Sequence, residues 1–317
     1  MGTTRQNIVR GPGTVKFDGV NLFDAGGITA EVESSTQAIP SSIAGNLDTI
    51  KTDQIGKVTL TPVGEISSAL LTLLYPFQTP NPGASIMGSM DKPLVISSRA
   101  GTKVTFYNAA LSKIPDLILS PVKTAFGSAE FTALLANGKL PTDSNSFFNV
   151  ETAAYVDGEP GRTGLSGCHY TGTWGTGQGV LSIPDTLDGW TVNFELQLDP
   201  VTTDSQGTID YTLGGLTVRA SCTPLGLSEQ QILAALPILS GRGASTATAK
   251  DLVIAAPNPG LTVTLKSAAL VTGPLAWGAT TLRAGQIGFI AHRAVSSGTL
   301  GALYSVAQTE AANSTAE

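Results

Sequence analysis

The chain has 317 residues, and only 13% of them are charged, with 18 basic and 24 acidic side chains giving a net charge of −6. Its 36 glycines and 18 prolines exceed their usual share in globular proteins. The mean hydropathy of +0.16 excludes a disordered chain, and the longest apolar helical run, 69–76, is too short to span a membrane. We therefore expect a turn-rich, mostly β protein with a polar but weakly charged surface.

The shortage of charge is the first indication of function. A free monomer usually stays soluble behind a mixed, charged surface, so a weakly charged surface suggests that partners cover much of it. A β-sandwich with a neutral coat fits the same composition, and both interpretations stay open. The negative net charge argues against static binding to DNA or RNA, which relies on Lys and Arg at phosphates.

The two cysteines, Cys168 and Cys222, stand far apart and outside any CxxC or CxxH pattern. This spacing indicates neither a disulfide framework nor a zinc site. We predict two buried free thiols, with pairing in an oxidising compartment as the alternative. Residues 1–13 contain no apolar segment of the kind that a secretory signal needs. We expect the protein to stay in a cytosol or to be released by lysis.

The chain contains an internal repeat. The aligned blocks are 58–75 with 218–237, 93–115 with 251–274, and 127–131 with 285–289. They occur in the same order and at nearly constant spacing, which chance matches would not preserve. Because a repeat determines the whole fold, we predict two copies of one domain.

Each copy has the same predicted elements, since alternating residues indicate strands and apolar residues three and four apart indicate a helix. The first copy has expected strands at 28–33, 57–61, 93–98, 103–111 and 126–135, and a helix over 66–74. The second has expected strands at 190–198, 216–221, 251–256, 261–270 and 283–293, and a helix that begins at Ser228 and carries Ile232, Leu233 and Leu236. The expected fold class is mostly β, with two tandem barrel or sandwich domains, each flanked by one α-helix.

The predicted domain organisation follows from the repeat. The first domain covers 1–136, a linker or surface excursion 137–166, the second domain 167–296, and a flexible C-terminal tail 297–317. Acids outnumber bases between 137 and 189, so most of the net negative charge lies there and both repeats are close to neutral.

No group of residues predicts catalysis. The two histidines, His169 and His292, lack a partner nucleophile and an orienting acid in the sequence. Cys168 and His169 are neighbours, but adjacent strand residues point to opposite faces. Glu31 and Glu33 share a strand face, whereas glycosidases draw their two carboxylates from different elements. We expect no enzyme activity, no cofactor and no metal site.

The most informative segment is 34–56, a predicted loop between two strands. Hairpin loops are usually a few residues long, and long ones tend to be functional or to order on binding. Apolar residues in such a loop indicate a partner surface, with a loop folded back on its own domain as the alternative. The residues concerned are Ile39, Pro40, Ile43, Leu47, Ile50 and Ile55. The matching loop of the second copy, 199–215, is expected to be shorter and polar.

The core pattern of the first copy matches one known from a protein family. It consists of residues 94–110, followed by Pro115 and by 127–131. One helix follows a Pro-x-Gly turn, and a long loop follows the first core strand. In these features the chain resembles the tail tube proteins of long-tailed bacteriophages, well over 14–136 and more weakly, through the repeat, over 168–296.

The resemblance implies a virion structural protein whose domains form rings around a continuous inner β-barrel. With two tube domains per chain, a homotrimer would make one ring, and the loop 34–56 would reach onto the next ring in the stack. Double-stranded DNA would pass through the lumen without tight binding, and tape measure, terminator and baseplate proteins would be further partners. No membrane partner would be expected. The protein would be found in the virion tail after assembly in the host bacterial cytoplasm.

The wall of such a conduit should offer few cations, because Lys and Arg would bind the passing phosphates. Glu31, Glu33 and Glu195 are the acidic candidates for residues that face the lumen. Strand register decides which face they occupy, and a slip of one residue reverses it.

Two other functions fit parts of the pattern. A tube protein of a contractile injection or type VI secretion system is the nearer one, but such proteins are typically single-domain hexamers. A secreted glycan-binding β-sandwich would require a signal peptide and aromatic side chains that stack on sugars, whereas this chain has only 3 Trp.

Overall fold

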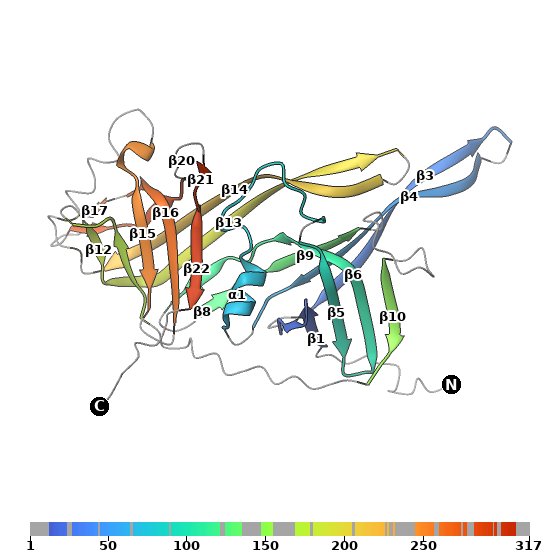
Figure 1. The fold of residues 1–317 in the computed structure, drawn as a ribbon, viewed down its shortest axis with the longest axis horizontal. Helices are drawn as coiled ribbons and strands as arrows, with labels where there is room; N and C mark the ends of the chain where they lie inside the picture. The colour runs from blue at the N-terminus through green and yellow to red at the C-terminus, as the bar shows by residue number, and fades with distance from the viewer. Residues whose placement is uncertain are drawn as a thin grey trace.

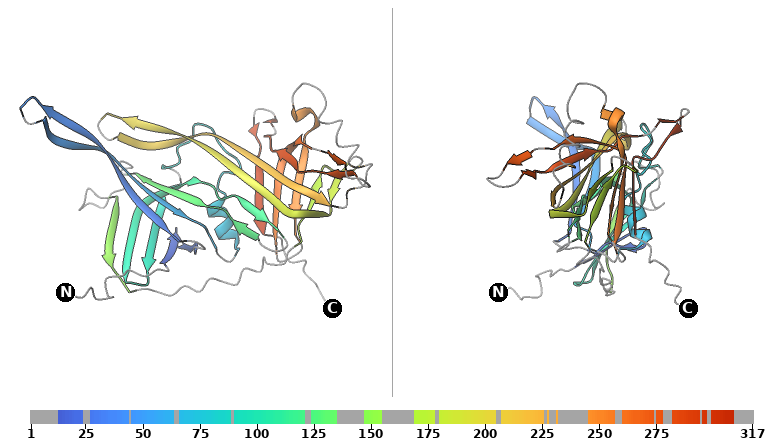
Figure 2. Two further views of the ribbon diagram at one scale, coloured as in Figure 1. Left: turned by 180° about the vertical axis from the view of Figure 1, so that it is seen from behind. Right: turned by 90° about the vertical axis from the view of Figure 1, so that its left-hand side faces the viewer.

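The computed structural model confirms a mostly β chain, with 67% of the residues that it describes in strands and 6% helical. It describes residues 13–23, 27–43, 45–63, 66–88, 90–120, 124–134, 147–154, 169–177, 180–204, 207–225, 227, 231, 245–256, 260–273, 275–277, 282–293, 295–296 and 299–308. Two large antiparallel sheets lie side by side, and two long hairpins extend from them toward the same end of the molecule (Figures 1 and 2).

The first sheet has eight strands in the order β2-β1-β5-β6-β9-β4-β3, with β10 paired to β6. Its strands are β1 (Gly13–Phe17), β2 (Val20–Asn21), β3 (Thr29–Ser41), β4 (Gly45–Leu60), β5 (Lys92–Ser98), β6 (Thr102–Lys113), β9 (Ala129–Leu134) and β10 (Phe148–Thr152). The long partners β3 and β4 form a continuous hairpin at one edge of the sheet.

The second sheet has ten strands in the order β12-β11-β15-β16-β19-β14-β13-β7-β8, with β22 paired to β16. Its strands are β7 (Leu117–Leu119), β8 (Thr124–Phe126), β11 (Thr171–Trp174), β12 (Leu181–Ile183), β13 (Asp185–Thr203), β14 (Gly207–Leu225), β15 (Lys250–Ala255), β16 (Leu261–Thr272), β19 (Ile287–Ile290) and β22 (Tyr304–Gln308). Strands β7 and β8 come from the first half of the chain, so the two halves share a sheet.

The two halves repeat one topology down to the register of single residues. Val58 of β4 lies opposite Ala30 and Phe131, and its counterpart Ala220 of β14 lies opposite Val192 and Phe289. Both hairpins shift register at matching places, at Ser35/Thr36 and Ile39/Pro40 in the first and at Gln197/Leu198 and Val201/Thr202 in the second. Such bulges bend and twist a hairpin, so both hairpins have the same shape by the same means.

Three smaller elements complete the described structure. Strands β17 (Leu275–Trp277) and β18 (Leu282–Ala284) form one two-stranded ribbon, and β20 (Val295–Ser296) and β21 (Thr299–Leu300) form another. A single 3-10 turn, η3 (Ser245–Thr248), precedes β15.

The helix of the first half, α1 (Ser68–Leu74), confirms the predicted one apart from a start two residues later. The Ser67 hydroxyl accepts a hydrogen bond from the Leu70 backbone N–H at 3.2 Å, which satisfies one of the free donors at the first turn. Leu70, Leu71 and Leu74 are all buried, as their spacing predicts. The predicted helix of the second half lies outside the described residues, apart from Gln231.

The two sheets share one hydrophobic core. The ring of Phe194, on β13, lies 5.1 Å from that of Tyr75 and 5.0 Å from that of Tyr304, measured between centroids. Tyr75 follows α1 and donates its hydroxyl hydrogen bond to the Pro115 carbonyl at 3.0 Å. Burial raises the pKa of Tyr75 well above its ordinary value, so the hydroxyl stays protonated as a donor.

Two segments differ from the predicted domain limits of 1–136, 137–166, 167–296 and 297–317. Strand β10 lies in the expected excursion 137–166 but pairs with β6, and β22 lies in the expected loose tail but pairs with β16. These two strands occupy equivalent places in the two halves. Tyr304 of β22 is fully buried, so residues 304–308 belong to the second core because they cover apolar surface that would otherwise be exposed.

Candidate functional site

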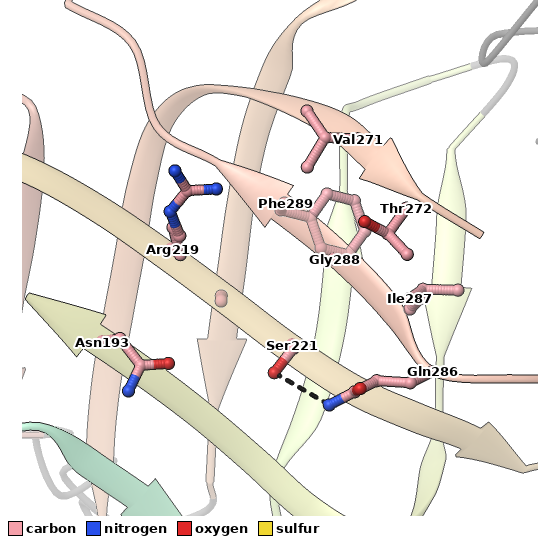
Figure 3. A pocket seen from close by; sticks show the side chains of 10 residues that line it. Asn193, Arg219, Ser221, Val271, Thr272, Gln286, Ile287, Gly288 and Phe289 are labelled. Atoms are coloured by element: carbon pink, nitrogen blue, oxygen red, sulfur yellow. Dashed lines mark hydrogen bonds between the residues drawn. The ribbon is translucent and has the colours of Figure 1, made fainter. Parts of the chain in front are cut away.

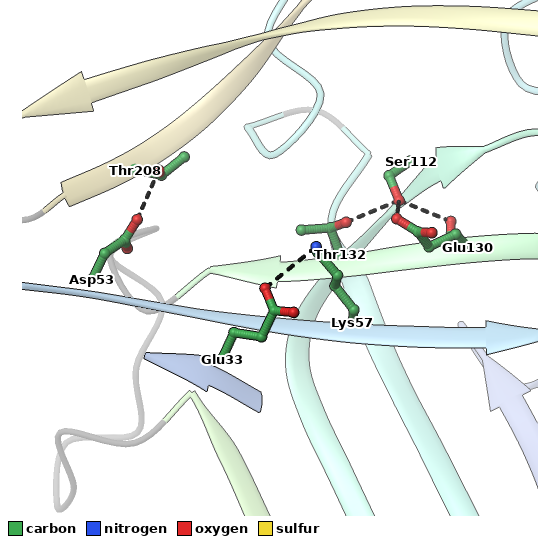
Figure 4. A network of polar contacts seen from close by, with 7 residues as sticks. All are labelled: Glu33, Asp53, Lys57, Ser112, Glu130, Thr132 and Thr208. Carbon is green, nitrogen blue, oxygen red and sulfur yellow. Dashed lines mark hydrogen bonds and ion pairs between the residues drawn. The ribbon is translucent and has the colours of Figure 1, made fainter. Parts of the chain in front are cut away.

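The first sheet has a polar face that points away from the core. Val58 and Leu60 of β4 are buried, so Lys57, which alternates with them, points to the opposite face. On this face the Lys57 ammonium lies 3.4 Å from the Glu33 carboxylate of β3 (Figure 4). Glu31 also lies opposite Lys57 in the register and is exposed. The register therefore places Glu31 and Glu33 together on the non-core face.

The second sheet carries an equivalent ion pair. Glu195 of β13 and Arg219 of β14 stand where Glu33 and Lys57 stand in the first sheet, with 4.0 Å between Glu195 Oε2 and Arg219 Nε. In both pairs the side chains remain 40% or more exposed. Exposed pairs contribute only about 0–1 kcal/mol to stability, so the repetition points to the character of the face rather than to folding.

Other polar groups of the first face are linked to one another. The Thr132 hydroxyl donates to Ser112 Oγ at 2.9 Å, and Ser112 Oγ donates to the Glu130 carbonyl at 3.1 Å (Figure 4). Tyr211 of β14 lies close enough to this face to interact with Lys57, and burial is the main cause that raises its pKa. The second hairpin therefore passes over part of the first sheet's polar face.

The polar face of the second sheet contains a small pocket of about 200 Å³. Asn193, Arg219, Ser221, Thr272 and Gln286 line it among apolar neighbours, and Gln286 donates to Ser221 Oγ at 3.3 Å (Figure 3). Ligand pockets usually measure about 300–1,000 Å³, so this hollow is smaller than a typical small-molecule site.

The predicted loop 34–56 is wrong as a loop, because it forms the outer part of the hairpin β3–β4. A three-residue turn closes the hairpin, and Gly45 accepts the left-handed conformation (φ 72°) that this turn requires. Residues 29–41 pair with residues 45–59 in an antiparallel ladder that is interrupted only by bulges, so the segment is a strand pair and not an irregular loop. The alternative of a loop folded back on its domain is not observed, since the hairpin extends away from its sheet (Figure 1).

The predicted apolar surface lies on this hairpin, with one exception. Ile43 at the turn is 97% exposed, and Leu47 and Ile50 on β4 are 66% and 51% exposed. Ile39 and Pro40 on β3 are exposed as well. The exception is Ile55, which is partly buried against the core.

The hairpin of the second half is not shorter than that of the first, which corrects the expectation for 199–215. Ser41 pairs with Gly45 around one turn, and Thr203 pairs with Gly207 around the other, at matching positions of the repeat. Gly207 has φ 68°, close to that of its counterpart. Outward from Thr29↔Thr59 and from Thr191↔Ser221, the two hairpins therefore extend by the same number of residues.

The two hairpins differ in what they contact. The backbone of Tyr211 and Leu213 on β14 exchanges hydrogen bonds of 2.8–2.9 Å with the segment 83–86, which precedes β5. The Thr208 hydroxyl donates to Asp53 Oδ2 at 2.8 Å (Figure 4). The second hairpin is thus held by the first half, while the first hairpin projects beyond the molecule (Figure 2).

The residues singled out for chemistry are not brought together into one centre. His169 Nε2 lies 2.6 Å from Asp185 Oδ1, and His292 Nε2 lies 3.0 Å from Ser245 Oγ, at separate places. Cys222 is a buried free thiol, and burial raises its pKa. Cys168 lies outside the described residues, and its pairing state stays a prediction.

Within the described ranges, no three His, Cys, Asp or Glu side chains are grouped so that they could hold a metal ion. Over the same ranges, every helix is too short or too polar to cross a membrane. Neither the models of known protein families nor the curated proteins give a match to this chain. The site therefore has to be interpreted from its own geometry.

Asp251 gives the second sheet a pH-dependent anchor. Burial alone would raise the pKa of Asp251, but hydrogen bonds from Lys266 Nζ (2.8 Å) and the Ser267 N–H (2.9 Å) outweigh burial and lower the pKa. The ionised carboxylate therefore stabilises the fold above the ordinary pKa of 3.8, and this contribution is lost as the pH falls through the lower folded value.

We expect Asp251→Asn to flatten the dependence of stability on pH in the acid range below pH 4. The measurement is the urea midpoint as a function of pH for both proteins. Lys266→Gln should remove part of the same dependence, because it deletes the donor of the side-chain hydrogen bond. Parallel curves for the natural protein and Asp251→Asn would contradict this assignment.

Proposed function

We propose that the protein is a structural subunit of a tube, the major tail tube protein of a long-tailed bacteriophage. In this proposal three chains form a ring of equivalent domains, and rings stack into a conduit for double-stranded DNA. Tape measure, terminator and baseplate proteins would be its other partners, and the virion tail its location.

The observation that carries the proposal is a repeated β unit whose long hairpin ends in exposed apolar residues. Ile43 and Leu47 project from the molecule on a paired, ordered hairpin rather than on an irregular loop. Exposed apolar groups gathered in this way usually mark a protein interface. A subunit that bonds to copies of itself needs such a projecting surface.

The polar faces support a role beside a polyanion. Glu33 with Lys57, and Glu195 with Arg219, form the same exposed pair on both sheets. Each cation is held next to a carboxylate, so it attracts phosphates less than an isolated cation would. Thr59 lies two residues after Lys57, and Thr217 lies two residues before Arg219. Each therefore shares a strand face with its ion pair and adds a hydroxyl group to that face. A surface of this kind suits DNA that slides and is not retained.

The first test is electron microscopy of the concentrated, full-length protein and of virions that contain it. We expect hollow tubes of uniform diameter, with three chains in each ring. A protein that stays monomeric at every concentration, and also in the presence of tail initiator proteins, would contradict the proposal.

A sharper test replaces both Ile43 and Leu47 with aspartate. Ring stacking should be lost, because two buried charges would replace two apolar contacts, while folding should be unchanged since both side chains are exposed. Tube length is measured by electron microscopy and secondary structure by circular dichroism. Val150→Asp is the matched control, because Val150 is 57% exposed but lies outside the hairpin. Tubes of normal length from the Ile43/Leu47 variant would refute the stacking role.

A further inference from the structure

The chain contains one complete example of a contact between its two halves. Strand β7 adds to β13 as an antiparallel neighbour, with Leu119 opposite Trp190, Ile118 opposite Thr191 and Leu117 opposite Val192. Strand addition of this kind supplies main-chain hydrogen bonds to an edge that would otherwise be unpaired. The first half thereby extends the sheet of the second half.

The second half has a counterpart of the strand that is added. The hairpin β7–β8 lies between β6 and β9 in the chain, and β17–β18 lies at the same place between β16 and β19. Both hairpins consist of three facing pairs, from Leu117↔Phe126 to Leu119↔Thr124 and from Leu275↔Ala284 to Trp277↔Leu282. Among the described strands, β17 and β18 pair only with each other.

The first half has a counterpart of the edge that receives it. Residues 28–30 of the first half match residues 190–192 of the second. Strand β3 is the last strand of the first sheet, whereas the second sheet continues beyond β13 through β7. The effect on burial is direct: Val192 is fully buried, whereas its counterpart Ala30 is exposed. The chain thus carries both parts of a second contact.

The glycines that precede β3 and β13 also support a second contact of this kind. Gly189 has φ 85°, and a Cβ there would overlap the Leu119 carbonyl oxygen and come within 2.8 Å of Ser120 Cα. Its counterpart Gly27 also has positive φ, 113°, but a Cβ there would meet no atom within 4 Å. The backbone of β7 and Ser120 therefore occupies the place of a Cβ at Gly189, whereas a Cβ at Gly27 would have room.

We propose that β17 of one copy adds to β3 of the next copy, as β7 adds to β13 within the chain. The register follows from the repeat: Leu275 opposite Ala30, Ala276 opposite Thr29, and Trp277 opposite Ile28. The contact is head-to-tail, so it produces a closed ring or an open filament. Only the closure of the ring rests on the proposed function; the contact itself rests on the repeat.

One part of the internal contact is not repeated. The Asp116 carboxylate accepts a hydrogen bond from the Phe194 N–H at 3.0 Å, whereas the corresponding segment 271–274 of the second half contains no acidic residue. The contact between copies therefore lacks this charge-assisted bond. It should be weaker than the internal contact and should depend on protein concentration.

The test is a pair of engineered cysteines in the full chain, Thr29→Cys with Ala276→Cys, after replacement of Cys168 and Cys222 by serine and alanine. Facing residues of antiparallel strands lie within the range that a disulfide spans. Mild oxidation at concentrations that favour assembly should give a ladder of covalent multimers on a non-reducing gel. Ile118→Cys with Thr191→Cys is the matched control, and it should give a cross-linked monomer from the equivalent pair.

The outcomes separate the contact from the proposed function. Tubes without the ladder would overturn the contact and leave the tube function standing. A ladder with open chains and no tubes would support the contact and count against the conduit. If the cysteine variant does not fold, hydrogen exchange on the unmodified protein decides: residues 28–30 and 275–277 should gain protection together as the concentration rises, and unchanged exchange would overturn the contact.

Discussion

Phe194→Ala is expected to lower the free energy of unfolding by about 3–5 kcal/mol, the usual cost of removing a buried phenylalanine. Phe194 is 5% exposed and lies between the rings of Tyr75 and Tyr304, at the place where the two sheets meet. The truncated side chain would leave a cavity among rigid rings that cannot close over it. Because this cavity lies in the shared core, both halves should lose stability together.

Chemical denaturation followed by fluorescence and circular dichroism measures this effect. Val32→Ala is the matched control, since Val32 occupies the equivalent position in the first half and is 42% exposed. We expect that substitution to change stability by at most about 0.5 kcal/mol, as exposed sites usually do. Similar losses for the two variants, or two separate unfolding transitions in the natural protein, would contradict the shared core.

Gly189→Ala is expected to be the second severe change. The left-handed conformation of Gly189, at φ 85°, strains any residue with a Cβ by about 1–3 kcal/mol. The added carbon would also overlap the Leu119 carbonyl oxygen, which belongs to a strand backbone and cannot move aside without breaking the pairing of β7 with β13. The total loss should therefore exceed the conformational strain alone.

Gly27→Ala separates these two causes. Gly27 has the same kind of conformation, at φ 113°, but an added Cβ would meet nothing within 4 Å in the chain. The stability of the isolated chain should fall by the strain only, so the difference between the two variants measures the clash with β7. Equal unfolding midpoints for Gly27→Ala and Gly189→Ala would show that the β7 contact contributes nothing.

The helix and the central strands could be predicted because their apolar residues lie on one face and their polar residues on the other. Leu70, Leu71 and Leu74 recur at helical spacing and are all buried. Val58 and Leu60 alternate with polar residues and face the core. In both cases one buried face produces a periodic pattern of apolar residues, and this pattern predicts the element from the sequence.

The outer hairpin could not be predicted because neither of its faces is buried. All but the last residue of β3 are exposed, so its apolar residues follow no inside–outside alternation. The strand exists through its pairing with β4, and pairing leaves no mark on composition. The length of the outer part of the second hairpin could not be predicted for the same reason.

Short strands and pairings between distant segments could not be predicted from the sequence either. Strand β7 has three residues, too few to establish a period, and its partner β13 lies far along the chain. Strand β22 does alternate, with Tyr304 and Val306 buried, but it follows a stretch of small polar residues that suggested a loose tail. Register explains the candidate site as well: pairing with β4 decides that Glu31 and Glu33 point away from the core.

The pairing of β7 with β13 also affects how fast any assembly of this chain can begin. The contact joins two parts of one polypeptide, so it forms during folding and does not depend on protein concentration. A ring built from such chains has half as many contacts between chains as one built from separate domains. Linking two units in one chain thus lowers the kinetic barrier to nucleation, and within a ring it leaves one kind of contact between copies as the step that concentration can control.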